Sequence, residues 1–229
     1  MQTGDFKIDT TPIDDFVIDI GRFSELGKQG VLALMSDSTN AARPGYTPSE
    51  RIVGETFSKF FSQAGDSRII VATFSSNIHR IQQIIDEAVH CGRKVAVSGR
   101  SMINVVSVAS ELGYLNVPDN VLVDIDMIKN YPANEMVIVT TGSQGEPMSA
   151  LHRIAFSEHR QVEIIPGDMI IISANPIPGN EKLVNKVINE LMKRGANVVY
   201  ERMYDVHVSG HACQEELKLM MSIIKPKYF

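Results

Sequence analysis

The sequence predicts an α/β protein built on a doubly wound, mainly parallel β-sheet, and two observations lead to that fold class. Short apolar runs rich in β-branched residues, such as residues 70–74, alternate with longer stretches of helical spacing, such as residues 77–90. This alternation is typical of parallel sheets. Several of the runs also end in small polar loops, most clearly at residues 136–147. Since such sheets bind ligands at the carboxyl ends of their strands, we expect a polar cleft at that edge.

The composition is that of an ordinary globular protein. The 229 residues are 44% hydrophobic and 21% charged, which is enough for one large domain or two small ones. No apolar run approaches the ~20 residues of a membrane span and no signal peptide is visible, so we expect no membrane association and a cytoplasmic location. Cys91 and Cys213 form neither a disulfide framework nor a zinc pattern. The net charge of −5 argues against polyanion binding by the whole surface, but it allows a local basic pocket.

The N-terminal part of the chain is the least regular. We expect a strand at residues 30–35, and Asp37 follows it in a polar stretch. A carboxylate just past a strand end can point into a cleft, but from the sequence alone an Asx-turn or a helix cap is the favoured explanation. The next helix is expected from Thr47, as N-cap, to about residue 63.

Strands and helices alternate through the rest of the chain. Glycines that would end helices follow several of the helical stretches, as at Gly92, Gly113 and Gly195. We expect strands at residues 68–74, 94–97, 121–125, 136–140, 161–165, 169–173 and 197–200, and helices at residues 77–90, 101–112, 126–131, 148–154, 181–194 and 214–224.

Polar loops after three of the strands carry candidate anion-binding groups. These are Ser75, Ser76, Asn77, His79 and Arg80 after the first strand of the sheet, Arg100 after the second, and Ser143 and Gln144 after the run at residues 136–140. A helix N-terminus, hydroxyls and a guanidinium together can cradle a phosphate. Each loop taken alone is equally well explained as a helix cap with surface charges. Their repetition along one edge favours an anionic ligand.

Two histidines, His207 and His211, lie on either side of Ser209 and Gly210. Gly210 disfavours a helix, so we expect a loop. The pair is accounted for either by polar side chains bonding to the backbone or, if Asp5 and Asp37 lie nearby, by a metal site, because histidine and aspartate together suit a metal such as zinc.

Five motifs in chain order give the sequence a close resemblance to a known family. They are Thr3-Gly4-Asp5-Phe6-Lys7, Ser36-Asp37-Ser38-Thr39-Asn40, Phe74-Ser75-Ser76-Asn77-Ile78-His79-Arg80, Thr141-Gly142-Ser143-Gln144-Gly145-Glu146-Pro147 and His207-Val208-Ser209-Gly210-His211. With them the chain resembles bacterial ribonuclease J, of the β-CASP branch of the metallo-β-lactamase superfamily. The resemblance covers essentially the whole chain, and the combined motifs are highly specific.

The resemblance implies a two-zinc hydrolase that degrades single-stranded RNA from a 5′-monophosphate end and also cuts internally, in mRNA decay and rRNA processing. It implies that Asp5 is a metal ligand bridging the two zinc ions, and that Asp37 and His211 belong to the two β-CASP motifs that assist catalysis. By position, the residues expected to face the RNA are Ser75, Ser76, Asn77, His79, Arg80, Arg100, Ser143, Gln144, His207 and Ser209.

The chain also departs from the family pattern. The His-x-His-x-Asp-His metal motif and the His-Gly-Glu motif are absent, and of the expected ligands only Asp5 is present. We therefore expect residues 46–202 to be an excised β-CASP domain, with residues 1–45 and 203–229 as flanking segments of a truncated metallo-β-lactamase domain. This fragment would be inactive and bind no zinc by itself, because zinc needs about four ligands. For the parent we expect single-stranded RNA, the missing domain and copies of itself as partners.

Two other functions remain open from the sequence. The fragment could be a non-catalytic module that binds the 5′ phosphate of RNA, or a mononucleotide-binding α/β protein. The glycine loops match neither the dinucleotide-binding nor the P-loop spacing, which counts against the latter.

Overall fold

The structure, a computed structural model, describes residues 1–201 and 203–229 and consists of two compact units. Unit 1 combines Met1–Ile52 with Val208–Phe229, and unit 2 is Val53–His207. These bounds differ from the predicted domain limits by several residues, and the predicted limit at residue 202 lies outside the described residues.

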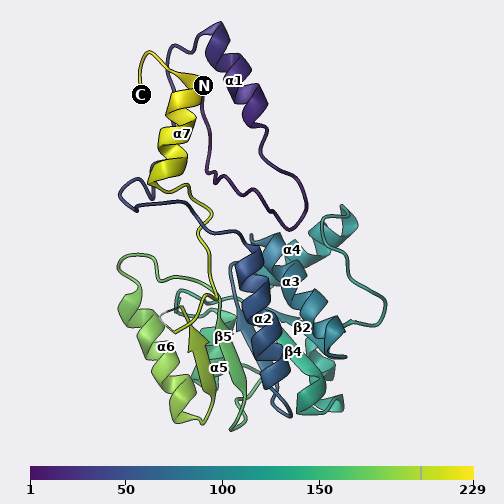
Figure 1. Cartoon of the computed structure of the whole chain (residues 1–229). Helices are drawn as coiled ribbons and strands as arrows, with labels where there is room; N and C mark the ends of the chain where they lie inside the picture. Colours follow the sequence, from purple (N-terminus) through teal and green to yellow (C-terminus); the bar gives the residue numbers. More distant parts are fainter. Residues whose placement is uncertain (202) are drawn as a thin grey trace. The chain divides into compact units, whose positions relative to one another are not determined.

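Unit 2 is built on a six-stranded sheet in which every pairing is parallel (Figure 1). The strands are β1 (Ile69–Ala72), β2 (Lys94–Ser98), β3 (Leu122–Val123), β4 (Met136–Thr140), β5 (Met169–Ile172) and β6 (Asn197–Tyr200). Their order across the sheet is β3-β2-β4-β1-β5-β6, so β1 lies in the interior between β4 and β5. The α/β fold with a parallel sheet is thereby confirmed.

Helices cover both faces of this sheet. On one face α5 (Ala150–Ala155) and α6 (Glu181–Lys193) pack with Ile70, Ile138 and Ile170 in a single core cluster. Residues at the alternate positions point to the opposite face, where Val71 and Val139 have no exposed surface. The remaining long helices of the unit are α2 (Arg51–Gln63), which begins just before it, α3 (Ile78–His90) and α4 (Arg100–Glu111), all with buried apolar residues. The short 3-10 helices η1 (Ile125–Asn130) and η2 (Ala133–Glu135) lead into β4.

The segment expected as a strand at residues 161–165 is not one. Its backbone N–H groups bond to side chains in place of a neighbouring strand: Val162 N–H donates to Nδ1 of His159 (3.1 Å), and Ile165 N–H donates to Oδ2 of Asp168 (2.9 Å). The alternating pattern therefore marks an extended connector with one buried side, at Val162 and Ile164.

Unit 1 has little regular structure. Its helices are α1 (Ile20–Gln29), which was not predicted, and α7 (Gln214–Ile224), which was. The strand expected at residues 30–35 is reduced to isolated bridges, Ala33 with Tyr228 and Met35 with Gln2. The core is small and centres on Ile8, Leu34, Met220 and Ile224.

No helix in the described part of the chain has the length and apolar character needed to cross a membrane.

Candidate functional site

Three side chains from distant parts of the sequence meet in unit 1. One ligand atom each from Asp5, Asp37 and His211 lies within 4.8 Å of the others. Asp5 is exposed in the N-terminal segment, Asp37 follows the bridge at Met35, and His211 lies in the loop before α7. The structure thus brings together the metal-ligand candidate and both catalytic candidates. Such proximity is the condition on which the sequence predicts a metal site, and His211 meets it.

Asp37 and His211 form a hydrogen-bonded pair. Nδ1 of His211 lies 2.9 Å from Oδ2 of Asp37, whose side chain is only 3% exposed. Burial by itself raises the pKa of Asp37, but hydrogen bonds from the backbone and hydroxyl of Thr39 and from His211 outweigh it, so the pKa lies below the usual range. An ionised carboxylate can only accept hydrogen bonds, so the hydrogen of this pair belongs to Nδ1 of His211. The other ring nitrogen, Nε2, is left for a substrate or a metal.

The loop that carries His211 is tied down by its own backbone. The His211 carbonyl accepts bonds from the Thr47 hydroxyl (2.8 Å) and the Asn40 side-chain amide (3.1 Å). Ser209 accepts from the same amide (2.8 Å) and from the His211 N–H (3.1 Å), so its hydroxyl stabilises the loop. Asn40 stands in a quoted motif and Thr47 was expected to cap a helix, but nothing in the sequence predicted that they support His211, because the groups they bind are more than a hundred residues away in the chain.

In unit 2 the predicted anion-binding residues lie at the carboxyl ends of the strands, and they fall into two groups. The first group is buried and holds the loops together. Arg80 is fully buried and donates from Nη1 to the Ser173 carbonyl (3.0 Å). Gln144 is 2% exposed and spans the loop after β5, donating to the Asn175 carbonyl and accepting from the Ile177 N–H, each at 2.7 Å. Ser143 is buried beside it.

The second group remains accessible. Ser76, His79 and Arg100 are exposed, whereas Ser75, Asn77 and His207 are half-buried. Asn77 also serves as the N-cap of α3, accepting from the Arg80 N–H at 3.0 Å. The buried residues of this edge therefore serve the structure of the loops, whereas the accessible ones remain candidates for binding a ligand.

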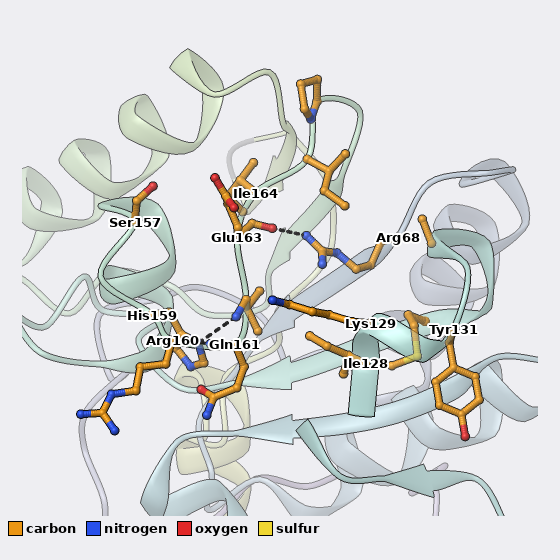
Figure 2. A pocket seen from close by; sticks show the side chains of 15 residues that line it. Arg68, Ile128, Lys129, Tyr131, Ser157, His159, Arg160, Gln161, Glu163 and Ile164 are labelled. Atoms are coloured by element: carbon orange, nitrogen blue, oxygen red, sulfur yellow. Dashed lines mark hydrogen bonds between the residues drawn. The ribbon is translucent and has the colours of Figure 1, made fainter. Parts of the chain in front are cut away.

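A separate cavity of about 590 Å³ opens at the opposite, amino edge of the same sheet (Figure 2). Arg68, Met136 and Pro166, which lie at or just before the starts of β1, β4 and β5, are part of its wall. Its charged groups are Arg68, Lys129, Arg160 and Glu163. Arg68 is already paired with Asp168, and the remaining charges are of both signs. Of these, Lys129 and Arg160 are positive and Glu163 is negative, and the cavity lies away from the edge where the sequence predicts a ligand.

Comparisons with known proteins indicate the same family as the motifs. A family model described as Ribonuclease J, beta-CASP domain, matches residues 66–191. Ribonuclease J of Helicobacter pylori (strain J99) is 50% identical over 229 residues, which are 100% of this chain and 33% of that protein. Ribonuclease J of Thermus thermophilus is 49% identical over 100% of this chain and 40% of its own length, and Ribonuclease J2 of Bacillus subtilis is 47% identical over 99% and 40%.

A solved structure is also similar. The crystal structure of a protein of unknown function from Enterococcus faecalis V583 has a TM-score of 0.65 and 15% identity, covering 98% of this chain and 50% of that one. At this identity the likeness shows the fold alone. The chain spans between 33% and 40% of the length of the curated relatives named above.

Proposed function

Since the chain belongs to the ribonuclease J β-CASP family, as its motifs predicted, we propose that it is the β-CASP domain, with flanking metallo-β-lactamase segments, of a metal-dependent ribonuclease. The observation that carries the proposal is the convergence of Asp5, Asp37 and His211. We propose single-stranded RNA as the substrate, with attack from a 5′-monophosphate end and at internal positions, in the cytoplasm and by an oligomeric parent.

The donor set fits part of a zinc site. It offers two carboxylates and an imidazole, whereas zinc takes about four ligands with nitrogen or sulfur among them. Asp37 and His211 are bonded to each other, so Asp5 is the donor best placed to ligate. When bound, zinc supplies Lewis-acid stabilisation of the charge on a phosphate. We propose that other segments of the parent complete the site, and that this chain alone binds no zinc and does not cleave RNA.

Asp37 and His211 would together transfer a proton during cleavage of the phosphodiester. With Nδ1 held by Asp37, the ring presents Nε2 in a fixed direction, which suits proton transfer at the phosphodiester being cut. The ionised carboxylate stabilises the positive charge that His211 gains when it takes up a proton. Asp37 thus orients the ring and His211 moves the proton.

We propose that the exposed side chains Ser76, His79 and Arg100 contact the RNA 5′ end, with Ser75, Asn77 and His207 beside them. Arg80, Ser143 and Gln144 would act through the shape of the loops that they hold, because they are buried. Guanidinium and hydroxyl donors next to the start of a helix are suited to a terminal phosphate.

Two measurements on the chain test the proposal. Binding of a short single-stranded RNA with a 5′-monophosphate is compared with binding of its 5′-hydroxyl form, and we expect tighter binding of the monophosphate. Arg100→Ala removes this preference, whereas Arg160→Ala, the same change at the opposite edge of the sheet, leaves it in place. Equal binding of both RNAs contradicts end recognition here.

A non-catalytic RNA-binding module remains the second candidate, and the incomplete donor set favours it for the isolated chain. RNA cleavage distinguishes the two. Chelator-sensitive cleavage by the full-length parent, lost on Asp5→Ala, supports the ribonuclease; a parent with all its domains and added zinc that binds RNA without cutting it leaves the binding module.

A further inference from the structure

A buried carboxylate in the first turn of α7 connects the three segments of unit 1. Glu216 has no exposed surface. Its Oε1 accepts from the Ile8 N–H (2.7 Å), and its Oε2 accepts from the N–H groups of Thr47 (2.7 Å) and Cys213 (2.8 Å). Among the described residues no lysine, arginine or histidine pairs with it. Three charge-assisted hydrogen bonds and the start of α7 offset the cost of burying this charge.

Each of these bonds leads directly to the candidate site. Ile8 lies three residues after Asp5 in the same extended segment, and Cys213 lies two residues after His211. Thr47 completes the connection, because its hydroxyl donates to the His211 carbonyl (2.8 Å) while its N–H donates to Glu216. One side chain therefore ties together the backbones on which Asp5 and His211 stand.

A helix cap alone does not account for this arrangement. The capping box of α7 uses the bond from Cys213, three residues away. The bonds to Ile8 and Thr47 reach across 208 and 169 residues of sequence, and they contribute nothing to the helix.

We propose that Glu216 is a positioning residue of the ribonuclease site: it holds the Asp5 segment and the His211 loop at the separation that the reaction needs. The proposal rests on the function proposed above. A carboxylate is required because three N–H donors converge on its two oxygens. A glutamine has one acceptor oxygen and an NH₂ group that would face N–H donors, so Glu216→Gln keeps the size and loses at least one of the bonds.

The first test uses the full-length parent that contains this chain. In Glu216→Gln we expect kcat on RNA to fall by roughly ten-fold or more while KM stays within about two-fold, as for loss of an interaction needed only in the transition state. Glu215→Gln, the same change at the neighbouring surface position paired with Lys218, is the matched control and should keep kcat. Met220→Ala lowers stability through the apolar core without touching Glu216. If Met220→Ala lowers kcat as much as Glu216→Gln at the same loss of thermal stability, Glu216 acts on stability alone and the proposal fails.

The second test needs no activity and uses the 229-residue chain. In Glu216→Gln we expect faster amide hydrogen exchange at Ile8, Thr47 and Cys213 and a changed ¹⁵N signal for the His211 ring, while exchange in unit 2 is unchanged. Faster exchange with an unaltered His211 signal would mean that Glu216 does not position the site. A parent without ribonuclease activity would overturn the proposed function and leave this second test to decide the structural role.

Discussion

The two units of the chain reach a defined structure by different routes. Unit 2 has a parallel sheet buried on both faces and an apolar core that runs from Ile70 in β1 to Val198 in β6. Unit 1 has four buried apolar residues in its core cluster, isolated bridges in place of a sheet, and a network of polar bonds through Asn40, Thr47 and Glu216. Apolar burial, which needs no exact geometry, dominates in unit 2, whereas hydrogen bonds with defined partners are prominent in unit 1. The unit that carries the candidate catalytic residues is the one whose shape depends on particular polar atoms.

The largest loss of stability is expected at a polar interaction in unit 2, the unit that otherwise depends on apolar burial. Arg68 and Asp168 form a buried ion pair, and Arg68 also donates to the Glu163 carbonyl (2.6 Å). Arg68→Ala leaves Asp168 buried without its cation, so we expect a loss of about 3–5 kcal/mol in the free energy of unfolding. Lys193→Ala, which breaks an exposed pair with Glu190, should cost less than about 1 kcal/mol. Denaturant unfolding of both variants measures this, and equal small losses would show that the buried pair is not needed.

In unit 1 the two helices pack closely at Gly27. A Cβ built on Gly27 of α1 would lie 2.4 Å from the Ile223 carbonyl oxygen of α7. Gly27→Ala therefore forces the helices apart, at a cost of about 1–3 kcal/mol, in spite of the better helix propensity of alanine. Lys28→Ala, at the next and exposed position, is the control and should be neutral or slightly stabilising. A Gly27→Ala protein as stable as the control would mean that the helices can separate freely.

In unit 1 the effect of losing polar bonds should be distinguishable from the effect of losing apolar packing. Asn40→Ala removes the donor that serves both Ser209 and the His211 carbonyl, and we expect about 1–3 kcal/mol of destabilisation. The His211 ring signal should change as well, because the loop loses its support. Leu34→Ala, in the core cluster of the same unit, should also lower stability but leave that signal in place. An identical His211 ring signal in the unmodified chain, Asn40→Ala and Leu34→Ala would contradict the idea that the Asn40 bonds set the shape of the loop.

The smallest effect concerns pH and distinguishes the units by the range in which each responds. Burial, together with the positive charge of Arg153, lowers the pKa of His159 in unit 2. In the folded state His159 thus binds its proton less readily than in the unfolded state, so its contribution is complete above the ordinary value of about 6.5 and is lost as pH falls below it. His159→Gln should flatten the decline of stability as pH falls below about 6.5.

In unit 1 the corresponding group is Asp9. Burial by itself raises the pKa of Asp9, but hydrogen bonds from Thr11, Ser49 and Glu50 and the charge of Lys7 outweigh it. The pKa therefore lies below the usual range. Its contribution is therefore complete above the ordinary aspartate value of about 4 and is lost only below it. Acid unfolding, followed by signals from each unit, checks whether unit 2 loses stability at higher pH than unit 1. Loss of unit 1 before unit 2 between pH 6.5 and 5 would contradict it.

The same contrast explains which parts of the structure could be predicted. Five of the six strands of the sheet lie within predicted runs and β2 extends one residue beyond its run, because buried parallel strands have a local apolar pattern. Residues 30–35 and 161–165 have similar patterns, but the first segment pairs only through isolated bridges and the second bonds to side chains instead of a strand. A local pattern does not record how much partner backbone is present. The core of unit 2 was thus largely accessible from the sequence.

The roles of the site residues were accessible only through the motifs. Residue chemistry raised Asp5, Asp37 and His211 as a possible metal site, the resemblance implied their roles, and the structure adds that they lie together. Glu216 could not be found this way, since the backbone N–H groups that it accepts belong to any residue and carry no sequence signal. Arg80 shows the reverse case. A basic residue at a helix start can point toward solvent or inward, and here it is fully buried.

The position of β1 has a consequence for how the chain folds as it is synthesised. β1 is made first, yet it pairs with β4 and β5, with Ile69 opposite Val137 and Met169, and never with β2, which follows it. Until residue 172 has left the ribosome, an apolar strand therefore lacks one or both of its native neighbours. Contacts of such sequence separation are formed slowly, and unpaired apolar strands associate with whatever is available. We expect nascent chains that end before β4 to bind chaperones or aggregate, and chains that extend past β6 to escape this fate.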